Sequence, residues 1–324
     1  MRRRAATGFI ALVLALSLLA GCGGDEPFVA RDVKAAVVSY TPEPDPAVDD
    51  YAAPGNVMIV TMDLRLRDPE RIRAWREKGA IVLAYVNGVD HPDRSLGPLE
   101  ERLYGDDFPQ EWLHPDGLSN WPGTQLLDLS EGSPVATYRG YTGTWGGYVA
   151  EFIGREVIGD GSLFNGVFLD VWGDRVWAVD VGGRGSAWDR GVTAATQAIR
   201  EEVGPGVYLV ANNTPSPETA RFLNGRMFEG FDTEEHEGGW NQLTGGGETP
   251  GLLKSMDWEW AEPRLMVLWQ NQADPGAATV KELQDSAQRA SRTGEDIAVG
   301  ASDHQQGIPE PFGVTVPEAT TTGS

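Results

Sequence analysis

The chain has 324 residues, of which 26 are basic and 48 acidic, giving a formal net charge of −22 at pH 7. Such an acidic excess argues against nucleic acid as a partner, because phosphate binding relies on Lys and Arg side chains. It would also repel anionic lipid headgroups, and it favours a neutral or cationic ligand. This length is typical of a single α/β barrel.

The N-terminus has the pattern of a bacterial lipoprotein signal. Arg2 to Arg4 precede an apolar run, Phe9 to Ala20, that is shorter than the ~20 residues a membrane span needs. The run leads into Leu19-Ala20-Gly21-Cys22, which resembles the lipobox whose cysteine is diacylated. We expect a signal peptide at residues 1–21, a lipidated tether at 22–32, and an extracytoplasmic protein anchored to the bacterial cell membrane through Cys22. The alternative is an ordinary signal with a chance cysteine.

Eight short apolar runs rich in β-branched residues predict buried parallel strands. In chain order they are Ala35–Ser39, Val57–Met62, Ile81–Val86, Gly166–Leu169, Val207–Ala211, Met227–Phe231, Leu265–Trp269 and Ile297–Gly300. Helices are expected between most of them, at Asp68-Pro69-Glu70 onwards, Tyr148–Val157, Ala187–Val203, Ser216-Pro217-Glu218 onwards, Pro250–Trp260 and Ala277–Arg292. The alternation predicts an α/β fold, a (β/α)8 TIM barrel over residues 33–313, with a flexible tail at 314–324.

The interval from Asp90 to Asn165 is too long for one βα unit. It contains a further apolar run, Gln125–Leu129. We interpret the interval as a long inserted loop between strands 3 and 4, over the barrel mouth, followed by the third helix. The alternative is that Gln125–Leu129 is itself a barrel strand and that one of the terminal runs is not.

Polar and aromatic residues gather where the predicted strands end, which is where the sites of such barrels lie. Amides and carboxylates can bond sugar hydroxyls, and aromatic rings can stack on sugar faces. The candidates for substrate binding are Asp63, Tyr85, Asn87, Trp172, Asp174, Asn212, Asn213, Trp269 and Asn271. For chemistry we select Asp170 and Glu229, which follow strands 4 and 6, because glycoside hydrolysis usually needs two carboxyl groups across the scissile bond.

Several of these segments resemble one family. "FNGVFLD" and "MFEGF" are similar to the fourth- and sixth-strand motifs of glycoside hydrolase family 114, the endo-α-1,4-polygalactosaminidases and related glycosidase-like lipoproteins. "AYVNGVD", "QLLDLSEGSPVATYRGY" and "YLVANNT" resemble other segments of that family. The resemblance implies a (β/α)8 barrel that acts on a hexosaminide-type polysaccharide, with Asp170 as the nucleophile and Glu229 as the acid/base. The third-strand segment departs from the family pattern, which often continues into Gly-Glu, whereas Asn87-Gly88-Val89-Asp90 follows here.

Each candidate also has a structural interpretation. An Asp after a parallel strand, such as Asp170 or Asp63, can be a helix N-cap or a local hydrogen-bond acceptor. Glu229 and Asp174 could be ion-pair partners, Trp172 and Trp269 could be core residues, and two consecutive asparagines could form a turn. Two other functions stay open: a barrel that binds sugar without cleaving it, and the solute-binding lipoprotein of a transporter.

No cofactor or metal is expected. The four histidines have no ligand-like spacing, and the sequence has neither a G-x-S-x-G elbow nor a phosphate-binding glycine loop after a strand. The expected partners are an oligo- or polysaccharide and the membrane, the latter through the lipid on Cys22. We expect a monomer.

Overall fold

The computed structural model describes residues 34–39, 43–44, 46–92, 97–118, 124–161, 163–176, 179–212, 215–229, 258–271 and 296–302. At 228–229, 268–271 and 296–302 it describes the backbone only. Cys22, the segments predicted as signal, tether and tail, and nearly all of the predicted helices at Pro250–Trp260 and Ala277–Arg292 lie outside these residues.

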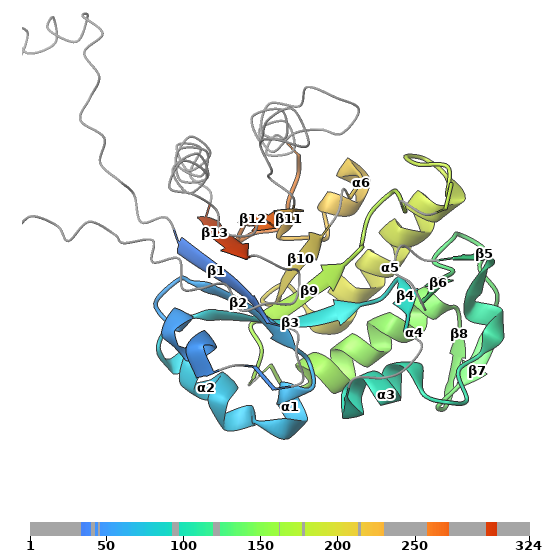
Figure 1. The fold of residues 1–324 in the computed structure, drawn as a ribbon. Coiled ribbons are helices and arrows are strands. Elements are labelled where there is room, and N and C mark those ends of the chain that lie inside the picture. The colour runs from blue at the N-terminus through green and yellow to red at the C-terminus, as the bar shows by residue number, and fades with distance from the viewer. Residues whose placement is uncertain are drawn as a thin grey trace, which may run out of the picture. The chain divides into compact units, whose positions relative to one another are not determined.

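Eight strands form a closed barrel (Figure 1). They are β1 (Lys34–Ser39), β2 (Val57–Thr61), β3 (Ile81–Asn87), β9 (Gly166–Asp170), β10 (Tyr208–Asn212), β11 (Gly225–Glu229), β12 (Leu265–Asn271) and β13 (Asp296–Ser302). Their order around the barrel is β1-β13-β12-β11-β10-β9-β3-β2, and every neighbouring pair is parallel. The predicted (β/α)8 barrel is therefore confirmed, and each predicted run overlaps one barrel strand.

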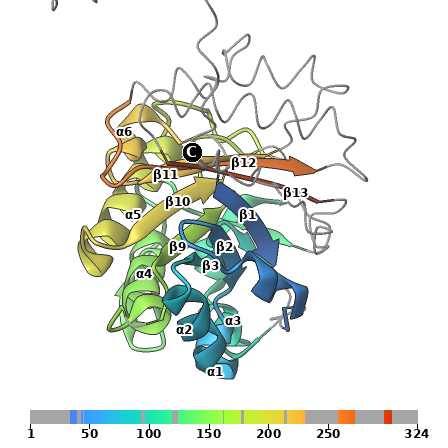
Figure 2. The ribbon, with the colours of Figure 1, turned by 90° about the vertical axis from the view of Figure 1, so that its left-hand side faces the viewer.

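The helices lie outside the strands that they connect (Figures 1 and 2). They are η1 (Pro46–Tyr51), α1 (Leu64–Arg67), α2 (Pro69–Glu77), α4 (Trp145–Phe152) with the π-helix η3 (Ile153–Ile158), α5 (Ala187–Val203) and α6 (Pro217–Ala220). The predicted caps are present. The Asp68 side chain accepts a hydrogen bond from the Arg71 N–H at 3.1 Å, and Ser216 accepts one from Thr219 at 3.3 Å.

An insert lies between β3 and α4, beside α4 and α5 in Figure 1. It contains β4 (Asp90–His91), α3 (Pro98–Tyr104), η2 (Gln110–Trp112), β5 (Leu113–Leu118), β6 (Gln125–Leu127), β7 (Ala136–Tyr138) and β8 (Tyr141–Gly143). Strand β6 pairs antiparallel with β4 and β5 and is no part of the barrel. The interpretation of this interval as an insert is confirmed, and the alternative that made Gln125–Leu129 a barrel strand is wrong.

Aromatic side chains form the core of the insert. Their rings meet one another at centroid distances of 5.2–6.4 Å, and the members are Tyr104, Phe108, Trp112, Tyr138, Tyr141, Trp145 and Tyr148. The indole N–H of Trp145 donates to the Gly88 carbonyl at 2.7 Å, which ties this core to the end of β3. Many of the chain's aromatic residues thus hold the insert on the barrel and are not available for sugar stacking.

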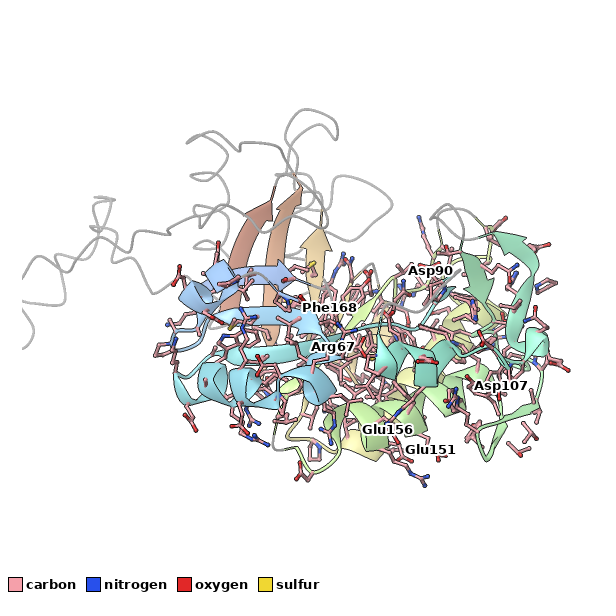
Figure 3. The ribbon with its side chains drawn as sticks, turned by 60° about the horizontal axis from the view of Figure 1, so that its bottom comes forward. Arg67, Asp90, Asp107, Glu151, Glu156 and Phe168 are labelled. Atoms are coloured by element: carbon pink, nitrogen blue, oxygen red, sulfur yellow. The ribbon has the colours of Figure 1, made fainter. Side chains whose placement is uncertain are left out.

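Side chains along the barrel strands alternate between two cores, as the period of a strand requires. One set packs under the helices, for example Val82 on β3, Val167 on β9 and Leu209 on β10. The other set fills the barrel: Ala36, Val38, Val57, Ile59, Leu83, Phe168, Val210, Met227, Leu265 and Val267. Phe168 is seen among the strands in Figure 3. This alternation decides which residues at the strand ends face the mouth.

Three asparagines fix strand register at the opposite end of the barrel. Asn56, Asn165 and Asn224 directly precede β2, β9 and β11. Their side-chain oxygens accept backbone N–H groups of the adjacent strands, from Ala35 at 2.9 Å, Val82 at 2.9 Å and Leu209 at 2.8 Å. A barrel end built in this way is rigid, so the strands can present side chains precisely at the other end.

Candidate functional site

The inward-facing positions at the carboxyl ends of the strands carry polar residues. Tyr85 and Asn87 continue the inward face of Leu83 on β3, and Asp170 continues that of Phe168 on β9. Asn212 continues that of Val210 on β10. On one side of β9, the register places Asn87 opposite Asp170. On the other side, Ala211 pairs with Leu169, so the next residue, Asn212, is level with Asp170. These four half-buried residues therefore meet at one side of the barrel mouth.

Asp170 is the centre of this group, because three donors hold its carboxylate. The Tyr85 hydroxyl donates to Oδ2 at 2.5 Å. The Asn212 side-chain amide donates to Oδ1 at 2.8 Å, and the Val171 backbone N–H donates to the same oxygen at 2.9 Å. The carboxylate oxygens act as acceptors in all three hydrogen bonds, which hold the side chain in one orientation.

The backbone directly after Asp170 is strained. Val171 has φ +55°, a left-handed conformation that is an outlier for a β-branched residue. The turn directs the Val171 N–H at the Asp170 carboxylate and the Trp172 N–H at the Asn212 carbonyl, at 3.1 Å. Strain of about 1–3 kcal/mol persists only where the surroundings impose it, and such outliers cluster at functional sites. No signal in the sequence predicts this feature, because valine disfavours the conformation.

Tyr85 and Asn87 are each fixed by their neighbours. The Tyr85 ring stacks against Phe168 at a centroid distance of 6.1 Å, which directs its hydroxyl toward the mouth. The Asn87 side-chain oxygen accepts the N–H groups of Val89 and Asp90 at 3.1 and 3.0 Å, and its amide donates to Asp90 at 3.1 Å. Asn87 thus shapes the turn into the insert, at whose start Asp90 lies in Figure 3.

Asp63 does not face the mouth, which corrects the expectation of a substrate contact. Its side chain is 1% exposed, and its Oδ1 accepts the Leu99 N–H at 2.5 Å at the start of α3. Burial raises the pKa of Asp63, while the backbone N–H groups of α3 and the nearby Arg67 oppose the rise. The residue anchors the insert to the loop after β2, which is the structural interpretation that the sequence had left open.

Trp172 is also corrected, from a candidate stacking surface to a core residue. It is 0% exposed, and its indole N–H donates to the Thr196 hydroxyl of α5 at 2.8 Å. Gly88 packs against its ring so closely that a Cβ at residue 88 would lie 2.6 Å from Cζ3. Neither ring face is open to a sugar.

Asp174 lies in the wall between the barrel and α5, and its expected substrate contact is likewise corrected. The side chain is 6% exposed and is therefore not presented to solvent. Burial, followed by the neighbouring charge of Asp189, raises the pKa of Asp174. Arg226 on β11 is close enough for the charge of Asp174 to stabilise its guanidinium.

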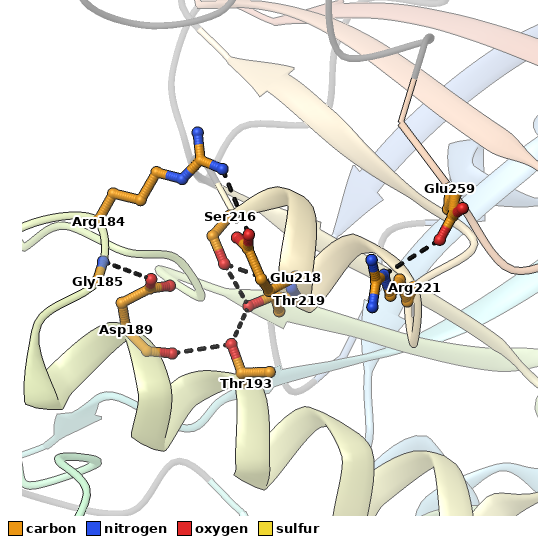
Figure 4. A network of polar contacts seen from close by, with 9 residues as sticks. All are labelled: Arg184, Gly185, Asp189, Thr193, Ser216, Glu218, Thr219, Arg221 and Glu259. Atoms are coloured by element: carbon orange, nitrogen blue, oxygen red, sulfur yellow. Dashed lines mark hydrogen bonds and ion pairs between the residues drawn. The ribbon is translucent and has the colours of Figure 1, made fainter.

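A polar network, which the sequence did not predict, ties the loop after β9 to α5 and α6 (Figure 4). The Gly185 N–H donates to the Asp189 carboxylate at 2.7 Å. The Thr193 hydroxyl donates to the Asp189 carbonyl at 2.9 Å and lies 2.7 Å from the Thr219 hydroxyl, which in turn lies 3.0 Å from that of Ser216. The network fixes the chain that leads away from Asp170.

The remaining candidates have no described side chains: Glu229, Asn213, Trp269 and Asn271. The backbone of β11 nonetheless places Glu229 two residues beyond Met227, at an inward position. Asn212 is level with Asp170 and pairs with Met227 on β11, so Met227 is level with Asp170 two strands away. Glu229 lies two residues further along β11. With about 4.8 Å between strands and about 3.3 Å per residue, the two Cα atoms are roughly 12 Å apart. Trp269 pairs with Glu229.

An open pocket of about 280 Å³ lies in the loop after β9 and is lined by Arg175, Val176 and residues 179–183. None of the predicted site residues lines it. Across the described residues, no helix combines the length and apolar character needed to cross a bilayer. The same part of the chain brings together no group of three or more His, Cys, Asp or Glu side chains that could hold a metal ion.

Comparison with solved structures agrees with this architecture. The glycoside hydrolase domain of PelA from Pseudomonas aeruginosa matches with a TM-score of 0.51 at 13% identity, over 82% of this chain and 94% of that domain. The α-galactosidase TtGalA from Thermus thermophilus matches with a TM-score of 0.50 at 14% identity, over 84% of this chain and 58% of that enzyme. The fold is a (β/α)8 barrel. No protein-family model and no curated protein sequence matches the chain.

Proposed function

We propose that this protein is a glycoside hydrolase in which Asp170 is the nucleophile and Glu229 the acid/base. The observation that carries the proposal is the Asp170 carboxylate at the barrel mouth, held by Tyr85, Asn212 and the strained Val171 backbone. Two further observations support it: Glu229 has an inward position on β11, and two of the solved structures that resemble this chain are named as a glycoside hydrolase domain and an α-galactosidase.

Both carboxyl groups take part in both steps of the reaction. In the first step the Asp170 carboxylate attacks the anomeric carbon, and the glycosidic C–O bond breaks as Glu229 gives its proton to the leaving oxygen. In the second step a water attacks the anomeric carbon of the glycosyl-enzyme and gives a proton to Glu229. The bond to Asp170 breaks and its electron pair returns to the carboxylate. A nucleophile must also be held in position, and the three hydrogen bonds to the Asp170 carboxylate do this.

The substrate class and the location are proposed from the sequence. The resemblance to glycoside hydrolase family 114 leads us to propose a hexosaminide-type polysaccharide of the bacterial surface or its surroundings. The net charge of −22 suits a neutral or cationic polymer. A lipid on Cys22 would hold the enzyme at the membrane, next to such polymers.

The test is a polysaccharide panel with detection of new reducing ends. We expect the wild type to cleave at least one hexosamine-containing polymer, and Asp170→Asn and Glu229→Gln to lose cleavage while keeping binding. Asp107→Asn and Glu70→Gln are matched controls. These carboxylates are 78% and 81% exposed, and they belong to the insert and to α2, not to the strand ends that form the mouth. Full activity in either site variant would refute the residue assignment. A wild type that binds polymers of the panel without cutting any would favour a sugar-binding protein instead.

A further inference from the structure

The two oxygens of the Asp170 carboxylate are not equivalent. Oδ1 accepts two hydrogen bonds, from the Asn212 amide and the Val171 N–H. Among the described residues, Oδ2 accepts from the Tyr85 hydroxyl alone. Each carboxylate oxygen has about two acceptor positions, so those of Oδ1 are filled whereas Oδ2 keeps one.

We propose that Oδ2 is the oxygen that attacks the anomeric carbon, and that Tyr85 is a positioning residue that assists the breakdown of the glycosyl-enzyme. The inference rests on the proposed function and adds to it the roles of the two oxygens. The new bond forms at the free position of Oδ2, and Oδ1 becomes the carbonyl oxygen of the glycosyl ester, with both of its donors in place.

The Tyr85 hydrogen bond changes strength during this cycle. It is charge-assisted while Asp170 is a carboxylate, and such bonds are roughly twice as strong as neutral ones. Once Oδ2 is an ester oxygen the charge is gone and the bond is weak. Tyr85 therefore stabilises the free carboxylate relative to the covalent intermediate, and it favours the step in which water releases the sugar and the charge returns to Oδ2.

Tyr85→Phe removes this bond and keeps the ring that stacks on Phe168. The intermediate should then accumulate. With 2,4-dinitrophenyl α-D-galactosaminide as the probe, the leaving group needs no proton, so breakdown limits turnover. We expect kcat to fall about tenfold or more, and KM to fall in proportion. The burst of one dinitrophenolate per enzyme should be followed by a slower steady state than in the wild type, and mass spectrometry should show a longer-lived sugar adduct on the Asp170 peptide.

Two further variants make the comparison specific. Asn212→Ala removes a donor to Oδ1, which is an acceptor in both the carboxylate and the ester, so kcat and kcat/KM should fall together, whereas Tyr85→Phe should lower kcat and leave kcat/KM unchanged. Tyr208→Phe makes the same chemical change at an inward-packed tyrosine near the start of β10, four residues before Asn212, and should behave like the wild type. Thermal midpoints confirm that each variant is folded.

A measurement that needs no turnover tests the hydrogen bond itself. A far-downfield, exchange-protected proton resonance is expected in the wild type and in Tyr208→Phe, and it should be absent from Tyr85→Phe and Asp170→Asn. If the wild type lacks it, or if Tyr85→Phe loses kcat and kcat/KM equally and its adduct lives no longer than that of the wild type, the role of Tyr85 is refuted while the hydrolase assignment stands. If the resonance is present and the wild type neither releases dinitrophenolate nor cleaves any polymer, the proposed function fails, and the role of Tyr85 with it.

Discussion

Replacing Thr196 by valine tests whether Trp172 is a core residue. Thr196 lies on α5 with 0% exposure; its hydroxyl accepts the Trp172 indole N–H at 2.8 Å and donates to the Val192 carbonyl at 2.6 Å. Valine has nearly the same shape and no acceptor, so the substitution leaves a buried N–H group unpaired. Such a group costs about 1–3 kcal/mol, and the free energy of unfolding should fall by that amount.

Urea unfolding, followed by far-UV circular dichroism, measures this change. The midpoint should shift without a change in the slope against urea, since the surface exposed on unfolding stays the same. Thr137→Val, on the exposed β7–β8 hairpin, is the matched control and should stay within about 0.5 kcal/mol of the parent. If Thr196→Val is as stable as the parent, or if it alters a sugar-dependent fluorescence signal while stability is unchanged, the placement of Trp172 in the core is refuted.

Three further predictions concern stability and location. Burial lowers the pKa of His91 below its usual 6.5, so the unfolded chain binds a proton at a higher pH than the folded chain does. The free energy of unfolding should therefore fall as pH drops below about 6.5. Urea unfolding at pH 7 and pH 5 should show this loss in the wild type and a smaller loss in His91→Gln. Asn165→Ala removes the acceptor of the Val82 N–H and should cost about 1–3 kcal/mol by urea unfolding, and a smaller effect would remove Asn165 from its register role. Cys22→Ser should release the protein from the membrane fraction or leave it unprocessed, and a variant that fractionates and migrates like the parent would contradict the lipid anchor.

The sequence predicted the barrel because the strands are short apolar runs, most of them rich in β-branched residues. The caps at Asp68 and Ser216 were predictable for the same local reason, since an N-cap followed by proline leaves the chain few alternatives. The insert was predictable from length alone, because no single βα unit needs the residues between Asp90 and Asn165. Its internal sheet and aromatic core were not, because they depend on contacts among residues far apart in the chain.

The candidate site divides in a similar way. Tyr85, Asn87, Asp170 and Asn212 lie within strands, where alternation fixes which side chains face the mouth. Asp63, Trp172 and Asp174 lie one or more residues beyond a strand end, where alternation no longer applies. Their side chains are oriented by contacts that only the folded structure shows. Asp63 bonds to the start of α3, Trp172 bonds to α5, and Asp174 is buried. The left-handed Val171 is the clearest case, since local preference opposes the conformation that the fold imposes.

The central claim is that Asp170 is the nucleophile, and covalent trapping tests it most directly. A 5-fluoro α-D-galactosaminyl fluoride should form a slowly hydrolysed ester with the wild type, and peptide mass spectrometry should locate the added mass on Asp170, with no labelling of Asp170→Asn. Retention also requires that the carboxyl groups of Asp170 and Glu229 lie roughly 5–5.5 Å apart in the trapped enzyme. A label on Glu229 or on another carboxylate, or cleavage of a polymer with inversion at the anomeric carbon, would contradict the account.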